Sequence, residues 1–182
     1  MHIYTEITPN PATLKFITTQ QLVQNGVADF PDAASTEGIS TFAGHLFRYP
    51  FVSGVFIGRN FVTVTKSDTA RWEDVIPVVK EDLKNWITAG KPLVDKEEAL
   101  APATDDADEI VQRIKTLIEE QVRPAVAMDG GDIIYEDFTE GVVKLRLRGS
   151  CSGCPSSMVT LKMGIENMLK RMVPEVQAVE AV

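Results

Sequence analysis

The N-terminal half of the chain alternates β-type runs with one long amphipathic segment. Strand-forming residues occupy 13–17, and two further β-rich runs within 51–66 flank a Gly-Arg-Asn sequence, which predicts a hairpin. Over 72–87 the apolar positions recur at steps of three and four, the spacing of one helix face. Gly90 then favours a helix stop. These patterns predict a mixed α/β module over residues 1–90.

The C-terminal part shows two helical stripes around two β-type runs. The predicted order is helix, strand, strand, helix and edge strand, at residues 110–122, 133–138, 142–147, 158–172 and 176–182. Asp108 is a suitable N-cap for the first helix, and Pro124 is expected to limit that helix. The pair Gly130-Gly131 predicts a tight turn into the first strand. We expect a two-layer α-β-β-α-β domain.

A segment at 91–107 separates these two patterned regions. It contains two prolines and five acidic residues, and it shows neither helical nor strand periodicity. This composition is typical of a solvated tether, and loops of this length are uncommon inside one compact domain. We therefore expect an α+β fold with two small two-layer domains, 1–90 and 108–182, joined by an acidic linker at 91–107.

Length and charge narrow the classes of function. With 182 residues the chain is long enough for one domain or two small ones, and too short for a large enzyme. A formal net charge of −8 disfavours nucleic-acid binding, which requires a basic face. No apolar run approaches the roughly 18 residues of a membrane span. The first residues lack the layout of a secretory signal or a transit peptide, which favours a bacterial cytoplasm unless this is a processed organellar form.

Both cysteines of the chain, Cys151 and Cys154, fall between the end of a predicted strand and the start of a predicted helix. Pro155 suits the first helical position, where its missing N–H costs nothing. The unpaired N–H groups at a helix start favour thiolates, and they would also favour an anionic ligand.

His45 is one of two histidines and has no acid at a spacing that implies contact. We therefore interpret it as a packed or surface residue rather than a catalytic one.

Four interpretations fit a Cys-x-x-Cys pair at this place. The cysteines could be unligated, or they could exchange thiols and disulfides, although only 28 residues follow Cys154 where a thioredoxin-like fold needs more. A structural zinc ion requires four ligands, and this module offers two cysteines and no histidine. The fourth interpretation is an iron–sulfur cluster, which is held by four thiolates.

The number of thiols decides what a cluster would require. One chain supplies two, so a four-thiolate cluster needs two chains, with the cluster on the two-fold axis of a symmetric dimer. Such a cluster has fewer bonds to each chain than one enclosed by a single fold, and it lies at an interface that can open. This arrangement is suited to transferring a cluster to another protein. A thiol–disulfide oxidoreductase that uses Cys151 and Cys154 directly remains the alternative, and it would work as a monomer.

The C-terminal motifs also carry a family resemblance. The sequence AMDGGD at 127–132, a hairpin, and LRGSCSGCPSS at 147–157 together resemble the C-terminal domain of NifU, the Nfu-type iron–sulfur scaffold domain, over 108–182. The first hundred residues resemble the Nfu N-terminal domain, most clearly at 4–16 and 47–56. The cysteine-bearing assembly domain and the ferredoxin-like domain of full-length NifU are absent, because the sequence contains no other cysteine.

The resemblance implies a carrier rather than an enzyme. Such a carrier binds a [4Fe-4S] cluster across a homodimer, receives it from upstream cluster-assembly proteins and passes it to apo-proteins. Cys151 and Cys154 match the cluster-ligating pair of the family. No family catalytic residue carries over to residues 1–107, and that part is expected to serve partner contact or domain arrangement.

Overall fold

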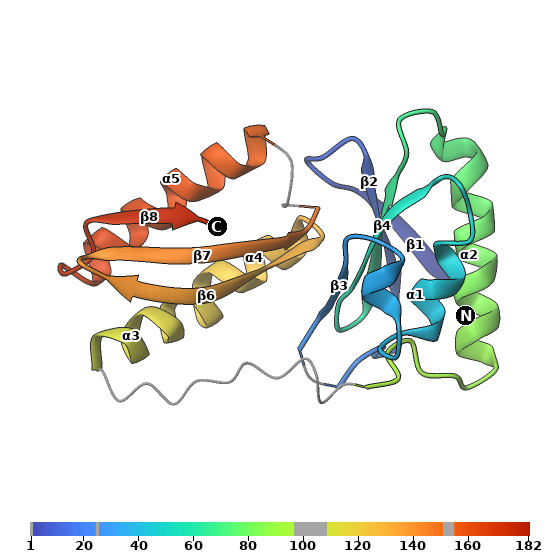
Figure 1. Cartoon of the computed structure of the whole chain (residues 1–182), viewed down its shortest axis with the longest axis horizontal. Helices are drawn as coiled ribbons and strands as arrows, with labels where there is room; N and C mark the ends of the chain where they lie inside the picture. Colours follow the sequence, from blue (N-terminus) through green and yellow to red (C-terminus); the bar gives the residue numbers. More distant parts are fainter. Residues whose placement is uncertain (1, 25, 97–108, 151–154) are drawn as a thin grey trace. The chain divides into compact units, whose positions relative to one another are not determined.

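Two separate units make up the chain in the computed structural model, Met1–Pro102 and Ala103–Val182 (Figure 1). The structure describes residues 2–24, 26–96, 109–150 and 155–182. Each unit combines one β-sheet with helices and has its own apolar core. The expected α+β class is therefore confirmed. Within the described ranges, no helix is long and apolar enough to cross a membrane.

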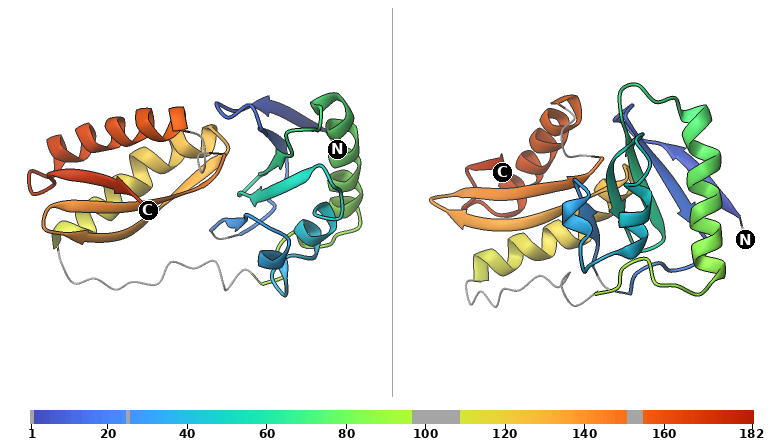
Figure 2. Two further views of the ribbon diagram at one scale, coloured as in Figure 1. Left: turned by 45° about the horizontal axis from the view of Figure 1, so that its top comes forward. Right: turned by 45° about the vertical axis from the view of Figure 1, so that its right-hand side comes forward.

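The first unit is built on an antiparallel five-stranded sheet. Its strands lie in the order β1-β2-β5-β4-β3, with bounds Ile3–Ile7 (β1), Thr13–Thr18 (β2), Ala28–Phe30 (β3), Val52–Ile57 (β4) and Phe61–Lys66 (β5). The short 3-10 turn η1 and the helices are Ala34–Thr36 (η1), Thr41–Leu46 (α1) and Trp72–Thr88 (α2). The helix α2 runs along the sheet in both views of Figure 2. The strand at 13–17, the hairpin within 51–66 and the long helix are confirmed.

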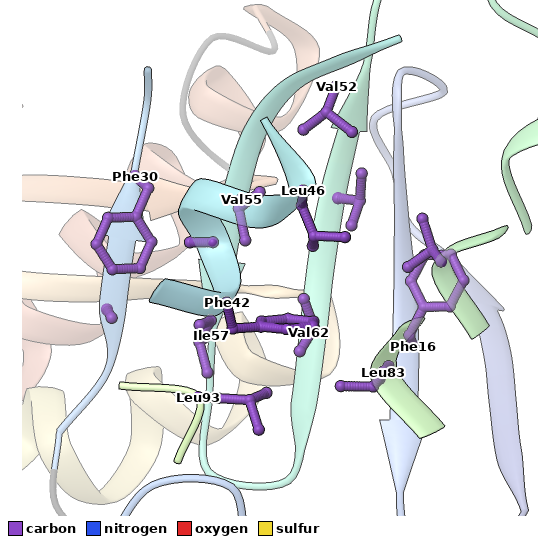
Figure 3. Packing of buried hydrophobic residues seen from close by; sticks show 14 of the residues in the cluster. Phe16, Phe30, Phe42, Leu46, Val52, Val55, Ile57, Val62, Leu83 and Leu93 are labelled. Atoms are coloured by element: carbon purple, nitrogen blue, oxygen red, sulfur yellow. The ribbon is translucent and has the colours of Figure 1, made fainter. Parts of the chain in front are cut away.

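Apolar side chains from the sheet and both helices form the core of this unit. Phe16 and Val62 on the sheet meet Phe42 and Leu46 of α1 and Leu83 of α2, and all five are fully buried (Figure 3). Burial of side chains of this size contributes about 1.5–3 kcal/mol each, which makes this cluster the main source of the unit's stability.

Residues 91–95 differ from the linker expected over 91–107. Leu93 and Val94 are buried in the core of the first unit, and the Leu93 carbonyl accepts a hydrogen bond of 2.5 Å from Ser40 Oγ. The Asp95 carboxylate accepts hydrogen bonds from the backbone N–H and the hydroxyl of Thr41. Two apolar residues between prolines and acids are too few to show a period, and this is why the sequence pattern did not reveal their packing.

The second unit pairs a three-stranded sheet with two helical segments. Its elements are Glu109–Leu117 (α3), Ile118–Val122 (η3), Arg123–Met128 (α4), Gly131–Thr139 (β6), Val142–Gly149 (β7), Pro155–Met172 (α5) and Ala178–Ala181 (β8). The strands lie in the order β6-β7-β8. β6 and β7 form the expected hairpin, and β8 pairs in parallel with β7 after the α5 crossover. The predicted α-β-β-α-β order is confirmed.

The first helical segment of this unit is longer than predicted. Pro124 was expected to limit it, yet the chain stays helical to Met128 because the π-helical segment η3 resets the hydrogen-bond register. Pro124 then lies in the first turn of α4, where its missing N–H leaves no hydrogen bond unmade. The expected N-cap, Asp108, lies outside the described residues.

Candidate metal centre

The two predicted ligands, Cys151 and Cys154, lie outside the described residues. The site is therefore described through the segments that lead into and out of 151–154. β7 leads in and ends at Gly149, and α5 leads out and begins at Pro155, the residue expected at the first helical position (Figure 2). Within the described ranges, no group of three or more His, Cys, Asp or Glu side chains could hold a metal ion.

Hydrogen bonds fix the residue before Cys151 to the Asp-Gly-Gly-Asp turn. Ser150 is 2% exposed, and its backbone N–H donates to the Gly130 carbonyl at 3.3 Å. Its hydroxyl donates to the Asp129 carbonyl. Gly131 and Gly149 are paired in the β6–β7 ladder. The two motifs of the sequence are thus one structural unit, and the turn determines where the chain enters 151–154.

A glycine with a left-handed backbone ends β7. Gly149 has a φ of 68°, a conformation that L side chains other than Asn and Asp rarely adopt. We expect Gly149→Ala to lower the free energy of unfolding by about 1–2 kcal/mol, because its Cβ would be strained there. Gly149→Asn is the matched variant, and it should cost less since asparagine tolerates this region. Denaturant unfolding of the apo-protein, followed by circular dichroism, measures both, and equal losses for Ala and Asn would exclude backbone strain as the cause.

A buried ion pair holds the other end of the turn. The Asp132 side chain is 2% exposed and accepts two hydrogen bonds from Arg123, at 2.7 Å from Nε and 3.1 Å from Nη2. Arg123 Nη1 also donates to Glu119 at 2.7 Å. Burial alone would lower the pKa of Arg123, but the hydrogen bonds to Asp132 and Glu119 outweigh it, so the pKa is raised. The guanidinium therefore stays charged and connects α4 to the start of β6.

A second carboxylate connects α5 to the edge strand. Glu166 accepts hydrogen bonds from Lys170, one turn along the same helix, and from the backbone N–H of Val179 at 3.1 Å. The hydrogen bond from Lys170, followed by that from Val179, lowers the pKa of Glu166. Because the pKa is lowered, the stabilisation from this contact is present above the ordinary glutamate pKa and is lost as the pH falls through the lowered value.

His45 lies in a packed cluster of the first unit. Its Nε2 is 3.2 Å from Asp82 Oδ2, and the Tyr49 hydroxyl donates to the same oxygen at 2.7 Å. The hydrogen bond to Asp82 raises the pKa of Tyr49. The His45 ring also contacts Trp86 of α2. These contacts join α1 and its C-terminal turn to α2. Sequence spacing could not reveal the acid partner, because it lies 37 residues away along the chain.

Sequence reasoning also missed the Arg123–Asp132 pair. Asp132 belongs to the Asp-Gly-Gly-Asp turn that the sequence predicted, but the sequence pattern did not indicate that an arginine would pair with it. The one available signal is that Asp132 is followed directly by the apolar strand residues Ile133 and Ile134, since a charge at the buried end of a strand needs a partner.

Comparison with known proteins identifies the class of protein. Residues 114–180 match the NifU-like domain, and residues 3–90 match the N-terminal domain of the scaffold protein Nfu/NifU. The fold, with its Cys-x-x-Cys segment between β7 and α5, is thus that of an iron–sulfur scaffold protein. The chain belongs to the Nfu family of iron–sulfur cluster scaffolds.

Two relatives match over nearly the whole chain, and a solved structure matches over about half of it. The human "NFU1 iron-sulfur cluster scaffold homolog, mitochondrial" is 42% identical over 100% of this chain and 72% of the human one. The Arabidopsis thaliana "NifU-like protein 4, mitochondrial" is 46% identical over 99% of this chain and 65% of the plant protein. The solution structure of a NifU-like protein from Saccharomyces cerevisiae aligns with a TM-score of 0.48 and 26% identity, covering 53% of this chain and 87% of the yeast one.

The names of these relatives contradict the expected bacterial cytoplasmic location. The human, Arabidopsis and several Drosophila relatives are all named as mitochondrial proteins. The prediction was wrong because it relied on the lack of a transit peptide in the printed sequence, whereas the relatives are longer than this chain.

Proposed function

We propose that this chain carries a [4Fe-4S] cluster between two of its copies, bound through Cys151 and Cys154 of each, and transfers the cluster to apo-proteins. The proposal makes it a binding and transfer protein rather than an enzyme. One observation carries it: the only two thiols of a chain from a cluster-scaffold family fall in one Cys-x-x-Cys segment. A four-thiolate cluster therefore requires two chains.

The described structure supports an anionic cargo at this place. α5 is 18 residues long and begins at Pro155, directly after Cys154, and the first N–H groups of a helix have no acceptor within that helix. The positive end of a helix dipole stabilises thiolates and bound anions. On the other side, the hydrogen bonds of Ser150 to Asp129 and Gly130 restrict the chain immediately before Cys151. A restricted entry lowers the entropy lost when the thiolates bind.

Transfer is a ligand exchange at iron. A thiolate of the recipient forms an Fe–S bond while the bond from Cys151 or Cys154 breaks, and the displaced thiolate takes a proton from solvent. Iron and sulfide keep their oxidation states, so no external oxidant or reductant is required. Repeating the exchange at each ligand moves the cluster, and the two apo-chains separate. Upstream assembly proteins load the dimer by the reverse exchange.

The two units have separate tasks in this proposal. The second unit holds the cluster, and the first unit, which has a complete core, docks recipients or arranges the domains. The tether between them begins after Asp95, because residues up to that point pack on the first unit.

A shortened chain, Ala103–Val182, tests this division. We expect it to fold and to take up a cluster, because α3 to β8 and their apolar cluster all lie within it. It is expected to activate some apo-[4Fe-4S] enzymes more slowly than the full chain at equal cluster load. The measurement is the initial rate of enzyme activation with several recipients. Equal rates for all recipients would remove the docking role, and failure to bind a cluster would overturn the modular account.

A further inference from the structure

The outer side of α1 borders a hollow of about 490 Å³ in the first unit. On its inner side the helix contributes Phe42 and Leu46 to the core (Figure 3). Thr41, His45 and Arg48 are spaced by four and three residues, so they lie together on the outer side, and all three line the hollow. The described residues around this space all belong to the first unit. We call it the α1 hollow.

Charges of both signs line the α1 hollow. Besides the guanidinium of Arg48, it is lined by the carboxylates of Glu37 and Asp95. Among the described residues, neither Arg48 nor Glu37 forms an ion pair. Opposite charges thus share one hollow without neutralising each other, which leaves them available to a ligand.

Two of the groups that line the α1 hollow are fixed in place by hydrogen bonds. The Asp95 carboxylate accepts from the backbone N–H and the hydroxyl of Thr41 at 2.7 and 2.6 Å. The Asp95 N–H donates to the Ile39 carbonyl at 2.7 Å. The His45 ring is fixed by Asp82, at 3.2 Å. Groups that are ordered beforehand lose less conformational freedom when a ligand binds, so the α1 hollow is preorganised.

The lining favours a peptide over other classes of ligand. Among the described residues around the α1 hollow, none is a large apolar side chain, which disfavours a lipid. A small anion would pair with Arg48 and leave the two carboxylates unpaired, and a small cation would do the reverse. A ligand that carries both signs can pair with both.

The separation of the charges narrows this class further. Asp95 is bonded to Thr41, the first residue of α1, and Arg48 lies seven residues further on, which is about 10 Å at 1.5 Å per residue. The two charges of a free amino acid are only about 3 Å apart, too close to reach both ends. Three residues of an extended peptide span about 10 Å, which fits.

We propose that the α1 hollow binds an extended segment of a partner protein that carries an acidic and a basic side chain about 10 Å apart. The acidic side chain pairs with Arg48, and the basic one pairs with Asp95. The inference deepens the docking role that the proposed function gives to the first unit, and it rests on that role for the identity of the partner as a recipient of the cluster.

The first test uses the full chain without cluster and the blocked peptide Ala-Glu-Ala-Ala-Lys-Ala, followed through the amide signals of the protein by NMR. We expect the peptide to shift the signals of Thr41 and Gly44, which line the α1 hollow. Two like-charge peptides, with Glu at both places or Lys at both places, should bind at least about threefold more weakly, because each lacks one exposed ion pair.

Two variants assign each charge of the peptide to its partner. With Arg48→Gln, the mixed peptide and the all-Lys peptide should bind alike, because no guanidinium is left to favour Glu. With Asp95→Asn, which keeps an acceptor for Thr41, the mixed peptide and the all-Glu peptide should bind alike. Arg48→Gln should leave the melting temperature unchanged, because Arg48 is exposed and forms no ion pair with a described residue.

Arg59→Gln is the matched control, since Arg59 is an exposed arginine of the same unit, between β4 and β5 and outside the α1 hollow. It should leave the binding of all three peptides unchanged. Equal binding of the three peptides to the wild type would overturn the inference. So would signals of Thr41 and Gly44 that do not shift, or equal weakening by Arg48→Gln and Arg59→Gln.

Cluster delivery separates this inference from the proposed function. In cluster-loaded chains, Arg48→Gln should slow the activation of those apo-enzymes that the shortened chain Ala103–Val182 also activates slowly, whereas Arg59→Gln should act at the wild-type rate. If the wild-type chain takes up no cluster, the proposed function fails, while peptide binding, which needs no cluster, still tests the α1 hollow. If the cluster is delivered and Arg48→Gln acts at the wild-type rate, the docking inference alone is overturned.

Discussion

Alanine at either Cys151 or Cys154 is expected to abolish retention of an iron–sulfur cluster and to leave the apo-fold intact. The chain has no other thiol that could replace the lost ligand. With one thiolate from each chain, two copies offer only two of the four ligands that the cluster needs. The apolar core of the second unit is formed by helix and strand residues outside 151–154, so the free energy of unfolding should change by less than about 1 kcal/mol.

The measurement is iron and sulfide content per chain after reconstitution without oxygen, with the visible spectrum of the same sample. Val182→Ala serves as the control, because it also trims an exposed side chain of this unit and leaves both thiols in place. It is expected to bind as much iron as the wild type. Stoichiometric iron and sulfide in a single-cysteine variant would contradict the assignment of Cys151 and Cys154 as ligands.

The largest expected effect on stability comes from the Arg123–Asp132 pair. Arg123→Met leaves the 2% exposed Asp132 carboxylate without its partner, and breaking a buried pair in this way costs about 3–5 kcal/mol. The loss should appear as a lower denaturant midpoint for the second unit and as faster amide exchange in β6. Because the turn that anchors Ser150 ends at this pair, the variant should also retain cluster poorly.

A double substitution tests whether the unpaired charge of the buried Asp132 carboxylate is what destabilises the Arg123→Met variant. Arg123→Met with Asp132→Leu replaces both partners by apolar side chains, which is often close to neutral, so it should recover most of the stability lost by Arg123→Met. Arg71→Ala is the control, since its pair with Asp74 is exposed on both sides and contributes at most about 1 kcal/mol. A loss from Arg123→Met no larger than that from Arg71→Ala would show that the buried pair is not important.

Sequence pattern predicted the elements whose periodicity is strong. Both hairpins, the long helix and the order of the C-terminal unit were correct, because their apolar residues face one core and alternate or recur accordingly. β1 was missed because an edge strand pairs on one side only, and most of its side chains are exposed, including Ile7 at 89%. β3 is three residues long, too short to show alternation.

The remaining errors have tertiary causes. Pro124 is usually read as a helix limit, but the π-helical segment before it lets the helix continue. The packing of Leu93 and Val94 and the pairing of Asp132 depend on residues distant in sequence. The assignment of Cys151 and Cys154 as ligands stays a prediction from their spacing and number, because both lie outside the described residues.

The central claim is that one cluster is shared by two chains. The most direct measurement is iron, sulfide and mass on one sample of the full chain reconstituted without oxygen. The account predicts four irons and four sulfides per pair of chains, at twice the monomer mass of 20.0 kDa, and a monomer after the cluster is removed. A 20.0 kDa monomer that carries four irons, or one that carries no iron and exchanges disulfides, would contradict it.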